Sequence, residues 1–165
     1  MSLNSNRSNP VMVLKLLRLL PLLSIAAALW SAPAGALQFY VDAEIGDDRR
    51  SHVVVQDPET PWRTIAHALK IAHVVTRGRP HIIDVAEGTY APSNGERFPL
   101  QVTQTDIYLR SQGKVILDGE SQSGLLEITV PTSDFTLREF TLTNGSASQG
   151  GAVYCQTCSL KVVDS

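Results

Sequence analysis

We expect this chain to fold as an all-β solenoid, a parallel β-helix with one amphipathic capping helix near its N-terminus. Three observations predict this fold class. Short strand-like runs follow one another beyond residue 80, with Gly, Asn, Asp or Ser in most of the gaps between them. The runs repeat with a period in the twenties, which is typical of solenoids. Apolar residues follow a helical period in one segment, over 62–75.

Residues 1–36 have the organisation of a secretory signal peptide. Positive charges come first, an apolar run over 16–30 follows, and small residues around Ala34 and Ala36 form an A-x-A cleavage site. The alternative is a membrane anchor, but about fifteen apolar residues fall short of the roughly twenty that span a bilayer. Cleavage would leave Leu37 first. We therefore expect residues 37–165 to be secreted or held at the cell surface, with no stable membrane span.

The composition is that of a globular domain. The hydrophobic fraction is 43%, the charged fraction is 18%, and the net charge is −2. A protein that follows a nucleic-acid backbone needs a basic surface, so this charge balance argues against nucleic acid as a partner. The sequence does not favour any cofactor.

The exported part opens with a short strand over 39–41 and a loop over 42–50 that carries three aspartates. A carboxylate cluster can hold calcium, but the loop lacks EF-hand spacing. Asp and Gly are also ordinary loop residues. We therefore assign no metal site here.

The helical segment begins, on our prediction, with Thr60 as the N-cap and Pro61 in the first turn, and ends at Gly78 and Pro80. One of its faces is apolar. Because a solenoid end exposes its core and its strand edges, we expect this face to cover the first coil. The residues expected in this cap are Trp62, Ile65, Leu69 and Ala72. We interpret His67 and His73 as solvated or half-buried helix residues, not as metal ligands.

Strand-like runs then follow to the end of the chain. The expected strands are Ile82–Val85, Ile107–Arg110, Val115–Leu117, Leu125–Val130, Phe135–Arg138, Phe140–Leu142, Ala152–Tyr154 and Leu160–Val163. Counting Ile83, Ile107, Phe135 and Leu160 as coil starts gives roughly four coils.

The repeat predicts which residues stack on each other in neighbouring coils. DIYLRSQGKVILDG (106–119) and DFTLREFTLTNG (134–145) match at both ends, and SLKVVD (159–164) matches the start of the second. This alignment places Asp106 on Asp134, Leu109-Arg110 on Leu137-Arg138, and Asp118-Gly119 on Asn144-Gly145.

The stretch FTLTNGSASQGGAVY (140–154) shows how one coil turns into the next. Alternation predicts that Phe140 and Leu142 point into the core while Thr141 and Thr143 point out. Asn144-Gly145 suits a turn with left-handed backbone, 146–149 a surface loop, and Gly150-Gly151 a tight re-entry into the next strand.

The last coil has no cap in this sequence, because the chain stops at Ser165 in a strand-like run. We expect either further coils or a partner that stacks on the open C-terminal coil. Cys155 and Cys158 join two strand-like runs, and export would permit a disulfide between them. A local structural disulfide and free thiols both remain open. Redox or zinc chemistry is less favoured, because zinc needs two more ligands.

Several motifs in order resemble a known family. FYVDAEIGDD, TPWRTIAHAL, VAEGTY, NGERFPL and VILDG, over 39–119, are similar to the opening of secreted bacterial proteins of the pectin-lyase-like superfamily, and to a family catalogued as domain of unknown function 1565. The resemblance implies a right-handed parallel β-helix. The loop 48–60 departs from the family form, since it carries SHVVV over 51–55. NGSASQGGAVY (144–154) resembles one repeat of the polymorphic outer-membrane proteins, which implies a surface or adhesin-like role.

The superfamily includes polysaccharide lyases and hydrolases, which need clustered carboxylates or a basic residue beside them. The strand-borne acids are Asp84, Asp118, Glu127, Glu139 and Asp164. They are single and do not recur at one coil position, so we assign no catalytic residue. Arg110 and Arg138 align, and we expect them to extend to solvent or to pair with Glu127 or Glu139.

Two functions follow from these patterns. One is a non-catalytic exported module that binds a polysaccharide or a surface protein, because solenoid faces rich in Thr, Ser and Asn suit extended ligands. The alternative is the N-terminal part of a polysaccharide-degrading lyase or glycoside hydrolase whose active site lies in further coils.

Overall fold

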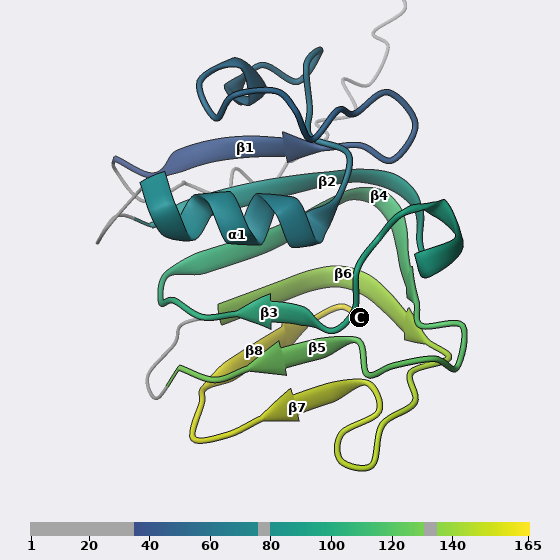
Figure 1. Ribbon diagram of the computed structural model, residues 1–165. Coiled ribbons are helices and arrows are strands. Elements are labelled where there is room, and N and C mark those ends of the chain that lie inside the picture. The colour runs from purple at the N-terminus through teal and green to yellow at the C-terminus, as the bar shows by residue number, and fades with distance from the viewer. Residues whose placement is uncertain (1–34, 76–79, 131–134) are drawn as a thin grey trace, which may run out of the picture. The chain divides into compact units, whose positions relative to one another are not determined.

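The computed structural model describes residues 35–75, 80–130 and 135–165. In it, two sheets, each made of parallel strands, face each other (Figure 1). Apolar side chains fill the core between them. The expected signal peptide lies almost wholly in 1–34, outside the described residues. Within the described ranges, no helix has the length and the apolar character to cross a membrane.

The chain alternates between the two sheets. The five-stranded sheet has the order β1 (Leu37–Val41), β2 (His81–Tyr90), β4 (Ile107–Asp118), β6 (Phe135–Thr143) and β8 (Leu160–Val163). The three-stranded sheet has the order β3 (Leu100–Val102), β5 (Leu126–Ile128) and β7 (Val153–Cys155). Every strand pair is parallel. This arrangement confirms the predicted parallel β-solenoid.

The solenoid makes about three turns, so the expectation of roughly four coils is wrong. Within the described residues, only β2, β4 and β6 are each followed by a strand of the smaller sheet. A helix follows β1 instead, and β8, which pairs with the first four residues of β6, is the last of the described strands. The pairs β2–β3, β4–β5 and β6–β7 therefore make the complete turns.

The observed register confirms the repeat alignment. Leu109 pairs with Leu137 and Arg110 with Arg138 between β4 and β6. The Asn144 side-chain amide donates to Asp118 Oδ1 at 2.9 Å, so the two turns do stack. The predicted partner of Asp106, at position 134, lies outside the described residues.

Several expected strands are longer in the structure than in the prediction. β4 contains two expected runs and changes register between Arg110 and Val115, where Gly113 has a φ of +133°. β6 also contains two runs, and Glu139 within it has a φ of +62°. These local bends keep one strand continuous around a corner. The prediction missed β3, whose three residues are too few to show a period.

Alternation in β6 is as predicted. Phe140 is buried, Thr141 is exposed, and Leu142 packs partly against the core. Beyond β6, Gly145 and Gly151 lie against each other. A Cβ added to Gly145 would lie 2.1 Å from the Gly151 carbonyl oxygen. This close approach explains why glycines stand at both ends of the polar loop.

Helix α1 (Ile65–Val75) begins four residues later than Pro61, so the predicted N-terminus is wrong. The chain before it still runs along β1, because Trp62 N donates to the Tyr40 carbonyl and Trp62 forms a parallel bridge with Val41. The hydroxyl of Thr60 donates to the Val54 carbonyl instead of capping the helix. At the true N-terminus, Thr64 Oγ1 accepts from His67 N.

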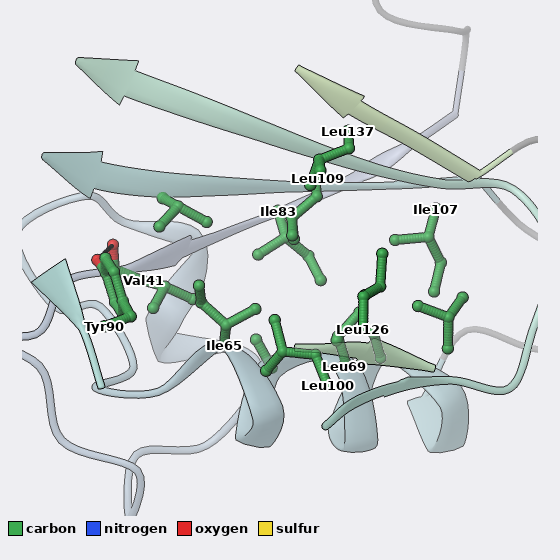
Figure 2. Packing of buried hydrophobic residues seen from close by; sticks show 14 of the residues in the cluster. Val41, Ile65, Leu69, Ile83, Tyr90, Leu100, Ile107, Leu109, Leu126 and Leu137 are labelled. Carbon is green, nitrogen blue, oxygen red and sulfur yellow. Dashed lines mark hydrogen bonds between the residues drawn. The ribbon is translucent and has the colours of Figure 1, made fainter. Parts of the chain in front are cut away.

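The helix packs against β1, β2 and β3. Figure 2 shows Ile65 and Leu69 pointing toward the same core as Ile83 and Leu100. The four residues expected in the cap, Trp62, Ile65, Leu69 and Ala72, are all buried in this core. Two 3-10 turns, η1 (Val54–Gln56) and η2 (Pro92–Asn94), lie in the connections on either side of α1 and β2.

Candidate functional site

A cavity of about 340 Å3 lies over the outer face of β1, β2 and β4, and is the strongest candidate site. We call it the Asp84 pocket. Its polar lining residues are Gln38, Tyr40, Asp42, Asp84, Arg110 and Gln112, and Pro58 and Pro61 line it from the loop that precedes α1.

The parallel register brings this lining together. Tyr40 on β1 pairs with Asp84 on β2, and Asp84 pairs with Arg110 on β4. Side chains of a strand alternate between faces, so these three point away from the core while the neighbouring Ile83 and Val85 are buried in it. Gln38 and Gln112 each stand two residues away along their strands and therefore share the outer face.

Asp84 is held by four hydrogen bonds. Its Oδ1 accepts from Arg110 Nε at 2.6 Å and from Gln112 Nε2 at 2.9 Å. Its Oδ2 accepts from Arg110 Nη2 at 2.8 Å and from Gln38 Nε2 at 2.5 Å. The Asp84 side chain is 1% exposed and that of Arg110 is 28% exposed. A buried carboxylate is tolerated when it is paired and fully hydrogen-bonded, and Asp84 meets both conditions.

The protonation states in the pocket favour binding over proton transfer. The hydrogen bond with Asp84 raises the pKa of Arg110, so the guanidinium stays charged and cannot act as a base. Burial, followed by the charge of Asp84, raises the pKa of Tyr40, so its hydroxyl keeps its proton at neutral pH. Asp84 itself is occupied by its four donors.

Other polar atoms in the pocket are uncommitted. Within the described residues, the Tyr40 hydroxyl, Arg110 Nη1 and the Oε1 atoms of Gln38 and Gln112 make no hydrogen bond. Asp42 Oδ1 accepts from the N–H groups of Glu44 and Ile45, which leaves its Oδ2 available. The pocket therefore offers donors and acceptors beside an aromatic ring. Its formal charge, from Asp42, Asp84 and Arg110, is −1.

The structure separates the other strand-borne acids. Asp118 lies at the end of β4, where N–H donation from Glu120 and then from the Asn144 amide lowers its pKa. This is the role of a turn residue. Glu127 lies on β5 in the other sheet, and Glu139 and Asp164 lie at positive-φ positions near the end of the chain. Of the five, only Asp84 lines the pocket.

The expected partner of Arg110 is wrong. Arg110 pairs with Asp84 on the preceding coil, and not with Glu127 or Glu139, because the register puts Asp84 directly beside it. Arg138 does pair with Glu139, at 3.1 Å between Nε and Oε1. Sequence reasoning missed the pair at Asp84 although a signal exists, since Asp84 and Arg110 are 26 residues apart, which is one repeat.

The aspartates of the first loop serve separate local contacts. Asp47 binds Arg49, while Asp48 accepts from the N–H groups of Arg63 and Thr64 and from the Thr64 hydroxyl. Within the ranges that the structure describes, no group of three or more His, Cys, Asp or Glu side chains could hold a metal ion.

Cys155 and Cys158 are joined by a disulfide, with their Cα atoms 5.7 Å apart. The bridge spans the short connection between β7 and β8. Neither cysteine lines the Asp84 pocket.

The comparison with protein families identifies the group to which this solenoid belongs. The family described as Protein of unknown function (DUF1565) matches residues 54–157, which is more than half of the chain. The chain therefore belongs to this family. No curated protein and no solved structure matches the chain.

Proposed function

We propose that this protein is an exported β-solenoid module that binds a neutral sugar unit of an extracellular polysaccharide in the Asp84 pocket. The observation that carries the proposal is the set of uncommitted polar atoms around the paired Asp84 and Arg110, beside the ring of Tyr40. A sugar presents hydroxyl groups that both donate and accept, and it also has apolar faces that pack on aromatic rings. Pockets with a few convergent polar groups and an aromatic wall are suited to such ligands.

The charge of the pocket selects among sugars. Arg110 already gives two of its hydrogen bonds to Asp84, and Asp42 adds a second negative charge. The carboxylate of a uronate would be repelled by the negative charges of Asp42 and Asp84. Of the Arg110 guanidinium, only Nη1 would be available to bind it. Unpaired or like charge in a partly buried site costs binding free energy. We therefore expect neutral sugars to bind and acidic ones to be rejected.

The alternative function, the N-terminal part of a polysaccharide-degrading enzyme, needs a free acid or base at the sugar. In the Asp84 pocket the carboxylate of Asp84 is occupied, and the pKa of both Arg110 and Tyr40 is raised. These features favour a binding role for this part of the chain.

A titration of neutral oligosaccharides by calorimetry tests the proposal. The panel is oligomers of glucose, mannose, xylose and galactose, with oligogalacturonate as the acidic comparison. Tyr40→Ala removes the aromatic wall and is expected to weaken binding by about tenfold or more. Tyr108→Ala is the matched control, because Tyr108 is a half-buried residue of β4 outside the pocket lining. Absence of binding by every neutral oligomer, or equal losses in both variants, would refute the proposal.

Export is part of the proposal and rests on the organisation of residues 1–36. β1 begins at Leu37, so cleavage after Ala36 would leave the first strand whole. N-terminal sequencing of the protein recovered from its native host tests it. A first residue of Leu37 in an extracytoplasmic fraction supports export, and retention of Met1 in the cytoplasm contradicts it.

A further inference from the structure

A second cavity, of about 380 Å3, lies over β5 and β7 of the three-stranded sheet. We call it the Glu127 groove. Its lining residues include Pro99, Ser123, Glu127, Ser146, Gln149 and Tyr154. The groove belongs to a different sheet from the Asp84 pocket, and the two share no lining residue.

Strand register places an aromatic ring beside the acid of this groove. Glu127 on β5 pairs with Tyr154 on β7, and Leu126 and Ile128 on either side of Glu127 are buried. Alternation therefore sends the side chains of Glu127 and Tyr154 to the outer face, on strands about 4.8 Å apart. One ligand in the groove can therefore contact both the carboxylate and the ring.

The Glu127 carboxylate has no partner among the described residues. No hydrogen bond or ion pair engages it, and the groove lining contains no Lys, Arg or His. The groove therefore carries one uncompensated negative charge beside a π-face. Both features attract a cation, because a carboxylate pairs with an ammonium group and an aromatic face binds cations within about 6 Å.

The rest of the lining supplies neutral polar groups. Ser146 N donates to the Ser123 carbonyl at 2.8 Å, which fixes the loop over the groove. Gly145 and Gly151 hold the base of the same loop in close backbone contact. Within the described residues, the Ser146 hydroxyl and the Gln149 side-chain amide make no hydrogen bond. These groups can contact hydroxyls of a bound ligand.

We propose that the Glu127 groove binds an amino sugar unit with a protonated amine. The ammonium group pairs with Glu127, the apolar face of the ring packs on Tyr154, and the hydroxyls contact Ser146 and Gln149. An N-acetylated sugar lacks the cation, so it would desolvate Glu127 without compensation. Among the described residues one carboxylate lines the groove, whereas glycoside hydrolysis uses a pair, so we assign the groove a binding role.

The test is calorimetric titration of the protein with a fully deacetylated glucosamine tetramer, its N-acetylated counterpart and tetralysine. Glu127→Gln preserves the shape of the side chain and removes its charge. We expect it to weaken binding of the glucosamine tetramer by about tenfold, the loss of one charge-assisted contact. Glu87→Gln is the control, because Glu87 is an exposed acid outside the groove lining. It is expected to leave the affinity unchanged.

Each contrary outcome overturns the proposal in a defined way. Equal binding of the N-acetylated tetramer, weakened by Glu127→Gln to the same extent, would remove the role of the ammonium group. Equal or tighter binding of tetralysine would assign the groove to a peptide. An unchanged affinity in Glu127→Gln would place the ligand elsewhere, and a loss in Tyr40→Ala would place it in the Asp84 pocket. The two proposals are distinguished by the variants, because Glu127 lines only the groove and Tyr40 lines only the Asp84 pocket.

Discussion

Arg110 on β4 reaches back one coil and binds Asp84 on β2 through two parallel hydrogen bonds, Nε to Oδ1 at 2.6 Å and Nη2 to Oδ2 at 2.8 Å. The two residues are direct neighbours in the parallel register. Their pairing joins two coils on the outer face and shapes the floor of the proposed sugar site. The stability of the fold and the proposed sugar site therefore depend on the same two side chains.

Substitution of Arg110 and substitution of Asp84 should lower the free energy of unfolding by different amounts. Arg110→Met leaves Asp84 charged and 1% exposed without its cation, so we expect a loss of about 3–5 kcal/mol in the free energy of unfolding. Asp84→Asn leaves a guanidinium that is already 28% exposed and can turn to water, so we expect a smaller loss, about 1–3 kcal/mol. Urea unfolding of both variants measures the difference. A larger loss in Asp84→Asn would contradict this account of the burial.

The polar loop over the Glu127 groove depends on Gly145. A Cβ at this position would lie 2.1 Å from the Gly151 carbonyl oxygen, and the backbone would have to move. We expect Gly145→Ala to lower the free energy of unfolding by about 1–3 kcal/mol. Gly124→Ala is the matched control, since its Cβ would meet the nearest atom at 3.4 Å, an ordinary contact. Equal stability of the two variants in thermal melts would show that the loop rearranges freely.

Glu96 should give the fold a specific pH dependence. Burial raises the pKa of Glu96 above its usual value of 4.5, although the N–H groups of Arg97, Ile65 and Ala66 oppose the shift. The folded chain therefore binds this proton more tightly than the unfolded chain. The stability that Glu96 contributes is fully present below its usual pKa, where Glu96 is protonated. This contribution is lost as the pH rises from about the usual pKa to the raised pKa of the folded chain.

Glu96→Gln removes this titration. The difference in unfolding free energy, the original chain minus Glu96→Gln, should decrease as the pH rises through that window and stay level above it. Urea unfolding of both proteins at a series of pH values measures it. A difference that increases with pH would mean that the three N–H donors outweigh burial and lower the pKa instead.

The Cys155–Cys158 bridge closes a very short loop, so its contribution should be modest. The chain-entropy relation gives about 2 kcal/mol for a loop of this length. We expect Cys155→Ser with Cys158→Ser to lose about that amount while keeping the fold, measured by circular dichroism during urea unfolding. Mass spectrometry after alkylation of the unfolded, unreduced protein is the check on the bond. Two alkylated cysteines would show that it is not formed.

Much of the fold could be predicted from the sequence because a solenoid repeats. The spacing of Leu109 and Leu137 fixes a strand pair directly, and alternation in β6 fixes which side chains enter the core. Strand lengths could not be predicted, because the bends at Gly113 and Glu139 keep chain segments in one strand that look separate in sequence. The start of α1 was missed because Thr60 and Pro61 suit a helix locally, while pairing with β1 holds the chain extended through Trp62.

The candidate sites were less accessible to sequence reasoning. Asp84 and Arg110 stand one repeat apart, and a search of aligned coil positions for opposite charges would have found them. The contribution of Gln38 and Gln112 could not be found in this way, because it depends on side chains reaching across strands from offset positions. The sequence shows Glu127 only as a single strand-borne acid with no repeat at the same coil position. Its pairing with Tyr154 needs the register of the short β5 and β7 strands.

The most direct test of the Asp84 pocket is a titration followed by NMR of the side-chain amide signals of Gln38 and Gln112. Both amides donate to Asp84 and both line the cavity. We predict that a neutral oligosaccharide shifts these two signals together, in proportion to occupancy, and that oligogalacturonate leaves them in place. Signals that do not move for any neutral oligomer, or that move for the acidic one instead, would contradict the proposed function.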